Sequence, residues 1–416
     1  MPLQPSDRDI SSSIDQQAGL GPPTIAFTGP RDGGTQAWLV CFGTFCAFTS
    51  SFGWLNSVGV FQAYHQTHYL QSYSSSTISW ISSVQVFIIF GGGIIFGKLF
   101  DDYGPHWLLV AGTFLQVFGL LMTAQCTEFY HFFLAQAVCS SIGASCIYYA
   151  SAGAISTWFL KKRATAFGLA AMGASVGGVF FPIMVTRLIG QVGFPWTMRA
   201  VALIVLCLDI TAISTVKSLL VHTRKDFSPR KYMNQLKDIS FVMLLTGMTM
   251  LSLGLWLPIN FLITQGREAG VPVGLVYGRF LPGVLGDKFG RLNVLFLATI
   301  LSGLLTLALW VPAKDTASVF VYAGLYGFSS GAYVSLGPSV VAQLSDIREI
   351  GMRNGVLYFF VGIAVLIGNP IGGQLVSVMN GDFLGLQLFA GVTMVVGACV
   401  IFSARIAIVG VRWKVV

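Results

Sequence analysis

Long apolar stretches, separated by short polar or charged ones, run along almost the whole chain. Apolar windows of about 20 residues have the length that an α-helix needs to cross a bilayer. Alternating strand patterns are absent from the sequence, which argues against an outer-membrane barrel. The pattern therefore predicts an all-α polytopic membrane protein. We predict spans at residues 36–63, 78–97, 107–125, 130–156, 164–189, 197–220, 239–262, 292–312, 317–343, 354–378 and 384–404.

Composition supports this prediction. Hydrophobic residues make up 54% of the 416 residues and charged residues only 10%, and the mean hydropathy is +0.74. A soluble chain of this length needs a more highly charged surface. Residues 1–34 are polar and rich in Pro, Gly and Ser, without an apolar signal core. We therefore expect a disordered cytosolic tail there, not a signal peptide, and a second cytosolic tail at 405–416.

The net charge of +8 follows the predicted topology. With the first tail inside, 19 of the 24 Lys and Arg residues lie on the cytosolic side, four lie outside and Arg279 lies within the membrane. This is the positive-inside bias of membrane proteins. It explains the basic composition without a nucleic-acid partner, so we expect membrane lipids and a small-molecule substrate as the partners.

A repeated motif divides the chain into two halves. The basic segment 221–238 separates an N-terminal six-helix half, 35–220, from a C-terminal half, 239–404. GKLFDDYG (97–104) and GVLGDKFG (283–290) share the spacing G-x-L-x-D-x-x-G, and each precedes a long apolar span. We expect each to form a short cytosolic loop, with a tight turn at its glycines and Asp101 against the positive end of a neighbouring helix. The candidate gating residues are Gly97, Asp101, Gly104, Gly283, Asp287, Gly290 and Arg291. A simple topological loop with solvated charges is the alternative.

Two six-helix halves with this Gly/Asp motif in both resemble the major facilitator superfamily. DGGTQAWLV (32–40) is similar to the opening signature of the monocarboxylate porters, and STWFLKKRATAFGLAAMGASVGGVFFP (156–182) to that family's fifth-helix segment. LSDIREIGMRNG (344–355) resembles the loop before the eleventh helix of fungal members. The resemblance implies a major facilitator fold and a secondary transporter that works by alternating access of paired halves.

The predicted eighth helix is short. Only about 16 apolar residues, 271–286, are usable, and they would form a helix of roughly 24 Å against a hydrocarbon core of about 30 Å. If this segment did not cross, the basic residues that follow would face outward, against the positive-inside bias. We therefore predict a short or partly unwound crossing. A deletion or a mis-joined exon explains the shortfall equally well.

The resemblance also suggests binding residues. In the monocarboxylate porters an Arg four residues before the loop Gly binds the substrate carboxylate, and Arg279 has that spacing to Gly283. A planar guanidinium suits a carboxylate, although an Arg that snorkels to the interface is the alternative. Two departures concern proton coupling: Leu275 stands where the family has Asp, and Asn56 where it has Lys.

Further candidates come from helices that line the central cavity in this superfamily. They are Asn56, Tyr148, Tyr149, Asn260 and Tyr333. Asp209, near the middle of the sixth span, is a candidate for proton relay, with a structural hydrogen bond to a neighbouring helix as the alternative. His65 and His68 stand one helical turn apart without a third ligand, so we expect residues at the membrane interface rather than a metal site.

These patterns predict a transporter of a small organic anion or related metabolite, with a co-transported proton as a further candidate partner. The alternatives are an exporter of a fungal secondary metabolite and a non-transporting relic or sensor. We expect no enzyme, because the sequence contains no catalytic cluster, and no cofactor. The sequence contains no ATP-binding P-loop, which argues against a primary pump. The plasma membrane is the expected location, with vacuolar or other endomembranes as alternatives.

Overall fold

The computed structural model describes residues 32–220, 222, 224, 229–268, 280–313, 315–346, 348–379 and 381–410. Every regular element in these ranges is a helix, which confirms the all-α prediction. Within the same ranges, 10 helical stretches are long and apolar enough to cross a membrane. One of them, Arg163–Thr215, contains most of two predicted spans, so each of the eleven predicted spans falls mainly on a helix.

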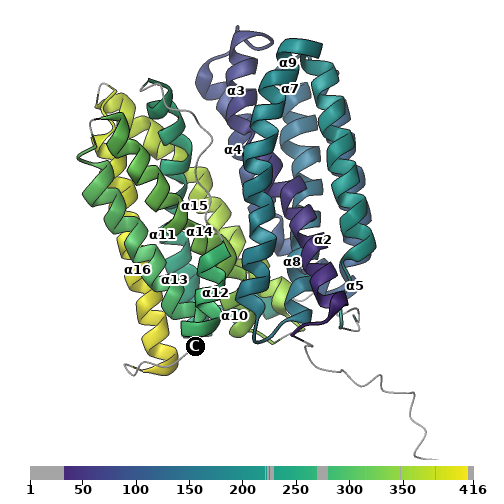
Figure 1. Cartoon of the computed structure of the whole chain (residues 1–416), viewed down its shortest axis with the longest axis vertical. Coiled ribbons are helices and arrows are strands. Elements are labelled where there is room, and N and C mark those ends of the chain that lie inside the picture. Colours follow the sequence, from purple (N-terminus) through teal and green to yellow (C-terminus); the bar gives the residue numbers. More distant parts are fainter. Residues whose placement is uncertain are drawn as a thin grey trace, which may run out of the picture.

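The N-terminal half forms one bundle (Figure 1). Its first spanning stretch is helical through a π-helical turn, and its last element is interrupted by a kink. The elements are α2 (Thr35–Phe48), η1 (Thr49–Gly53), α3 (Val58–Thr67), α4 (Ser75–Gly91), α5 (Gly93–Tyr103), α6 (Pro105–Thr123), α7 (Phe129–Phe132), η2 (Phe133–Ser140), α8 (Ser141–Trp158) and α9 (Arg163–Thr215).

The C-terminal half forms the second bundle, and a short helix of the basic segment precedes it. The elements are α10 (Pro229–Gln235), α11 (Ile239–Glu268), α12 (Phe280–Phe289), α13 (Arg291–Leu305), η3 (Thr306–Trp310), α14 (Thr316–Gln343), α15 (Ile350–Val378) and α16 (Leu384–Val409). Residues 269–279, which include most of the predicted eighth span and Arg279, lie outside the described residues. The length of that span stays a prediction.

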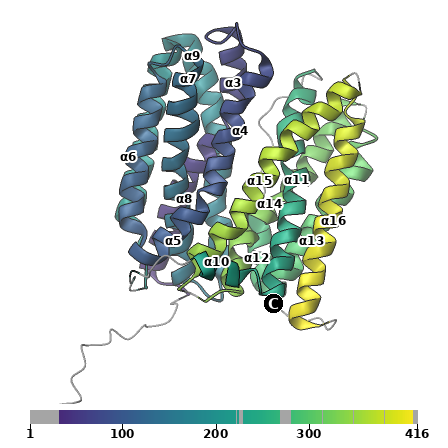
Figure 2. The ribbon, with the colours of Figure 1, turned by 180° about the vertical axis from the view of Figure 1, so that it is seen from behind.

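The two bundles stand side by side, and their ribbons approach most closely at the end that carries α10 and α12 (Figures 1 and 2). Lys161 and Lys288 also belong to this end, which we call the basic end. The outer faces are strongly apolar: Trp107, Phe114 and Leu203 are 69%, 67% and 62% exposed. Such faces suit a hydrocarbon solvent rather than water.

The kink in α9 separates its two spans. Gly193 has φ +78°, a conformation that favours glycine, and Pro195 follows it. Proline fits the start of a helix because it lacks an amide hydrogen that an interior position would need. The second span ends at Thr215, five residues before the predicted end at 220.

Small residues bring α9 against the first spanning stretch. A Cβ at Gly173 would lie 2.1 Å from the carbonyl oxygen of Phe45, and one at Gly177 would lie 2.7 Å from Cα of Gly53. The second contact falls on the π-helical turn η1. Close packing of this kind is how membrane helices associate without a hydrophobic driving force.

The prediction that the repeated motif forms a loop is wrong for most of its residues. Residues 97–103 belong to α5, and residues 283–289 belong to α12. The turns are confined to Gly104 and Gly290, with φ +78° and +94°. Neither segment contains a proline, so each helix continues until the glycine with positive φ, and in the first motif Pro105 follows that glycine.

Candidate functional site

Asp101, in the last turns of α5, lies against the first turn of α15 in the other half. Its Oδ1 accepts a hydrogen bond from the amide of Gly351 at 3.0 Å, and its Oδ2 accepts one from Met352 at 2.8 Å. The first amides of a helix have no partner within it, and they carry partial positive charge. The sequence predicts that Asp101 contacts the positive end of a neighbouring helix, and the structure identifies that helix as α15. We call this contact the first latch.

Glycines on both helices allow the first latch to form. A Cβ at Gly351 would lie 2.2 Å from the carbonyl oxygen of Gly97, and one at Gly355 would lie 2.0 Å from that of Gly93. Both pairs are four residues apart, so each helix presents one smooth face to the other. Gly97 was expected in a turn. It lies inside α5, where it permits direct contact between the two backbones.

Asp287, in the last turn of α12, makes the equivalent contact in the opposite direction. Its Oδ1 and Oδ2 accept hydrogen bonds from the amides of Ala164 at 3.1 Å and Thr165 at 2.7 Å, at the start of α9. Arg291 pairs with the same carboxylate at 3.1 Å, and both side chains are 10% exposed. We call this contact the second latch. Each half thus places one carboxylate on a helix start of the other half.

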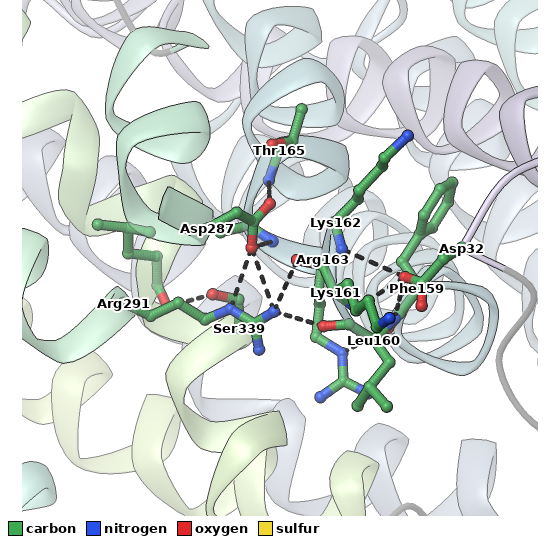
Figure 3. Close-up of polar contacts among 12 residues, drawn as sticks. Asp32, Phe159, Leu160, Lys161, Lys162, Arg163, Thr165, Asp287, Arg291 and Ser339 are labelled. Atoms are coloured by element: carbon green, nitrogen blue, oxygen red, sulfur yellow. Dashed lines mark hydrogen bonds and ion pairs between the residues drawn. The ribbon is translucent and has the colours of Figure 1, made fainter. Parts of the chain in front are cut away.

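The loop between α8 and α9 is held from two sides (Figure 3). Arg291 donates from Nη2 to the carbonyl of Leu160. On the other side, Oδ1 of Asp32 accepts from the amides of Leu160, Lys161 and Lys162 at 2.7, 2.7 and 3.2 Å. Three converging amides on one carboxylate oxygen resemble the arrangement of an N-terminal cap. Asp32 therefore positions the backbone that Arg291 contacts.

Aromatic side chains from both halves meet in the interior. The ring centroids of Tyr148 and Tyr358 are 6.1 Å apart, and the ring of Phe90 lies 5.7 Å from that of Tyr358 and 5.7 Å from that of Trp256. The hydroxyl of Tyr149 donates to the carbonyl of Phe90 at 2.7 Å. We call these five residues the central aromatic cluster. Within the described residues, the indole Nε1 of Trp256 is buried without a hydrogen-bond partner.

The structure brings only some of the predicted binding residues together. Tyr148 and Tyr149 belong to the central aromatic cluster. Tyr333 lies on α14, where its hydroxyl shares a 2.8 Å hydrogen bond with Ser252, one helical turn from Trp256. The side-chain amide of Asn56 instead donates a 2.8 Å hydrogen bond to the backbone carbonyl of Phe52, four residues earlier in the chain.

Three predicted residues are placed only in part or not at all. Gly283 lies within α12 and Asn260 within α11, but their immediate surroundings lie outside the described residues, as does the whole of Arg279. Their roles stay predictions.

Asp209 is enclosed within the N-terminal bundle and does not take part in the central aromatic cluster. It is 1% exposed, and its Oδ1 accepts from the hydroxyl of Ser50 at 2.6 Å. This hydrogen bond joins two helical elements, as the structural alternative for Asp209 predicts. Its Oδ2 is buried and has no hydrogen-bond partner among the described residues.

The two histidines have different environments. His65 was expected at the membrane interface, but it is 1% exposed, packs 4.2 Å from the ring of Phe132 and lies 3.4 Å from Oε1 of Gln136. His68 is exposed. No group of three potential metal ligands occurs among the described residues.

Sequence reasoning missed several residues at these contacts. Gly351 and Gly355 stand in the quoted segment 344–355, and their four-residue spacing is the signal that could have identified them. Asp32 was noted only as part of a signature. Tyr358 and Trp256 carried no signal, because aromatic residues are common in every span of this chain.

Comparison with known proteins identifies relatives over nearly the full length. The model of the family described as Major Facilitator Superfamily matches residues 40–280 and 268–409. The chain is 42% identical over 391 residues to "MFS-type transporter 1" of Ophiocordyceps sp., covering 91% of this chain and 87% of the relative. It is 38% identical over 415 residues to the "Fujikurins efflux protein" of Gibberella fujikuroi, covering 97% and 89%.

Among solved structures, the fold is similar to that of a bacterial homologue of the iron transporter ferroportin in its outward-facing state. The TM-score is 0.66 at 17% identity, and the match covers 89% of this chain and 99% of that one. At this identity the similarity concerns the fold alone.

Proposed function

The chain belongs to the Major Facilitator Superfamily, and we propose that it exports an organic metabolite by alternating access of its two halves. In this proposal the basic end faces the cytosol of a fungal cell and the protein resides in the plasma membrane. The two latches close the cytosolic side in the arrangement described above.

The observation that carries the proposal is the reciprocal placement of Asp101 and Asp287. Each carboxylate bonds two first-turn amides in the opposite half. A carboxylate at a helix start contributes about 0.3–1 kcal/mol when exposed and up to about 2 kcal/mol when partly buried. Contacts of this strength hold one state and can still break in each cycle. A transporter needs both properties.

The direction and the substrate class draw support from two further observations. The relative from Gibberella fujikuroi is named an efflux protein. The central aromatic cluster offers ring faces from both halves and a free donor at Trp256. Aromatic side chains pack well against flat, unsaturated molecules. We therefore propose an aromatic or polyunsaturated metabolite with at least one hydrogen-bond acceptor.

Two alternative functions differ from export in what they require or predict. Uptake of a small organic anion requires Arg279 as its carboxylate-binding group, and this residue lies outside the described part of the chain. A non-transporting relic or sensor is the other alternative. It predicts that removing the protein leaves the distribution of every metabolite unchanged.

Deletion of the gene in its own organism tests the proposal. Untargeted mass spectrometry of cells and medium should find at least one compound that is retained in the cells, and reintroduction of the wild-type gene should restore its release. The double variant Asp101→Asn/Asp287→Asn should fail to restore it, although the protein reaches the membrane. A deletion strain with unchanged ratios of all compounds between cells and medium contradicts the export proposal.

A further inference from the structure

The carboxyl group of Asp209 lies in surroundings that do not suit an ionised acid. It is 1% exposed, within a membrane-spanning stretch. None of the ion pairs found among the described residues includes it. The hydroxyl of Ser50 donates to it at 2.6 Å, and Oδ2 has no partner with full hydrogen-bonding geometry among the described residues. Ionisation of a buried carboxyl is strongly unfavourable unless donors or a cation compensate it.

The groups that face Asp209 from the packed helices are uncharged. The thiol of Cys46 faces it from α2, and the hydroxyl of Thr113 faces it from α6. Oγ1 of Thr113 and Oε1 of Gln116 are both buried without hydrogen-bond partners among the described residues. Hydroxyl and amide oxygens can accept a hydrogen bond from a protonated acid. The hydroxyl of Thr113 can thus accept from a proton on Oδ2, and none of the ion pairs among the described residues supplies a cation to replace that proton.

The partner of Asp209 belongs to the π-helical turn η1. The backbone carbonyl of Ser50 accepts from Nε2 of Gln116 at 2.7 Å, so this turn is held by both α6 and α9. π-Helical turns inside longer helices are frequent at functional sites. A change in the charge of Asp209 therefore acts directly on the turn.

The opposite face of η1 leads to the central aromatic cluster. Phe52 is two residues from Ser50, which places it on nearly the opposite side of the helix. Its ring centroid lies 4.8 Å from that of Tyr148 and 5.3 Å from that of Phe90. One short helical segment thus contacts the buried acid on one side and the cluster between the halves on the other.

We propose that Asp209 is a proton-binding site and that its protonation stabilises the arrangement in which both latches are closed. A proton from water adds to Oδ2, and its loss leaves a carboxylate that the packed N-terminal half does not accommodate. Deprotonation then shifts η1 and, through Phe52, favours separation of the halves at the basic end. The inference rests on the alternating access proposed above and adds a proton that binds away from the substrate.

The first test detects the proton itself. Infrared spectroscopy of the purified chain should show the carbonyl band of a protonated carboxyl in acid buffer, which disappears in alkaline buffer. Asp209→Asn should lack that pH-dependent band. An identical pH-dependent band in wild type and Asp209→Asn would show that the proton resides elsewhere.

The second test measures the separation of the halves without any substrate. Nitroxide labels at the exposed positions 162 and 288, one in each half, are introduced as a noncanonical amino acid so that the native cysteines remain. The wild-type distance should be short in acid and lengthen in alkaline buffer. Asp209→Asn, which imitates the protonated acid, should keep the short distance throughout. A pH response equal to that of wild type would overturn the proposal.

Matched serine variants guard against a folding defect in Asp209→Asn. Ser50→Ala removes the donor that stabilises the carboxylate, so the midpoint should rise by about one pH unit. Ser51→Ala makes the same change in the same turn, but the hydroxyl of Ser51 donates to the backbone carbonyl of Ala47 and not to Asp209. The midpoint of the pH-dependent change in distance should therefore not move. Equal shifts in the two variants would contradict the proposal. If Asp101→Asn/Asp287→Asn lengthens the distance while the wild-type distance does not change with pH, the proton site alone is wrong. If that double variant has no effect either, alternating access itself is wrong.

Discussion

The first and second latches start from the same sequence motif but reach different interfaces. At the first, proline follows Gly104 where Arg291 follows Gly290, so the motif itself supplies no arginine. The contact instead depends on glycines that let α5 and α15 touch backbone to backbone. At the second, Asp287 is paired with Arg291, and the network extends to Asp32.

The difference shows two physical routes to one function. The first latch is shaped by steric fit, so added volume should damage it most. The second is a partly buried charge network, in which loss of one partner leaves another uncompensated. The population of the closed arrangement, with both latches formed, is the quantity that separates the two routes. It is measured by the label distance between positions 162 and 288.

The largest effect is expected from added volume at the first latch. Gly355→Leu places its Cβ where only 2.0 Å separates it from the carbonyl oxygen of Gly93, and backbone atoms cannot move aside. We expect a loss of about 3 kcal/mol in the stability of the closed arrangement. Gly373→Leu on the same helix is the control, because no atom lies within 4 Å of that position. Equal effects of the two substitutions would refute the steric account.

Loss of the second carboxylate comes next. Asp287→Ala removes the two hydrogen bonds that the carboxylate accepts from backbone amides. It also leaves Arg291, which is 10% exposed, without its ion-pair partner. We expect a cost of about 2 kcal/mol. The double variant Asp287→Ala/Arg291→Leu should recover part of that cost, because it removes the uncompensated charge. A double variant that is less stable by the full sum of the single effects would argue against a coupled pair.

Loss of the first carboxylate should matter less. Asp101→Ala removes the two hydrogen bonds from the amides of Gly351 and Met352, so about 1 kcal/mol is expected. Measuring the distance between labels at positions 162 and 288 in Asp101→Ala and in Asp287→Ala compares the two effects directly. A larger effect for Asp101 than for Asp287 would mean that the charge network contributes little.

Asp32 should act only through the second latch. Asp32→Ala frees the amides of residues 160–162, and the backbone that Arg291 contacts becomes less well positioned. We expect a coupling of at least about 0.5 kcal/mol between Asp32→Ala and Arg291→Gln. Between Asp32→Ala and Asp101→Ala, which lie at different latches, the effects should simply add.

The smallest expected effect is a pH dependence at the first latch. His222 bonds the backbone carbonyl of Asp101 at 3.1 Å, and burial lowers the pKa of its imidazole. The neutral form therefore stabilises the packing of His222 against α5 within the folded N-terminal half. This contribution is complete above the ordinary histidine pKa of about 6.5 and is lost as the pH falls below it, through the lowered folded value. In the Asp209→Asn background, His222→Gln should remove a few tenths of a kcal/mol from the acid-induced loss of unfolding free energy; an unchanged loss would exclude His222 as its source.

Much of the fold follows from the sequence, because the spacing of apolar windows and the distribution of Lys and Arg are properties of the chain itself. The partners of the latches do not follow from it. Asp101 and Gly351 are 250 residues apart, and Asp287 and Ala164 are 123 apart. No local pattern states which helix start receives which carboxylate. Tyr148 could be proposed from its span, whereas Tyr358 joins it only once the halves are packed together.

The central claim is that the two carboxylates together hold the basic end closed. Distance measurements between labels at positions 162 and 288 in Asp101→Asn/Asp287→Asn, reconstituted in lipid at acid pH, test it most directly. We predict a distribution shifted to longer distances than in wild type, with each single variant in between and Asp287→Asn the farther from wild type. A double variant with the wild-type distribution would contradict the claim.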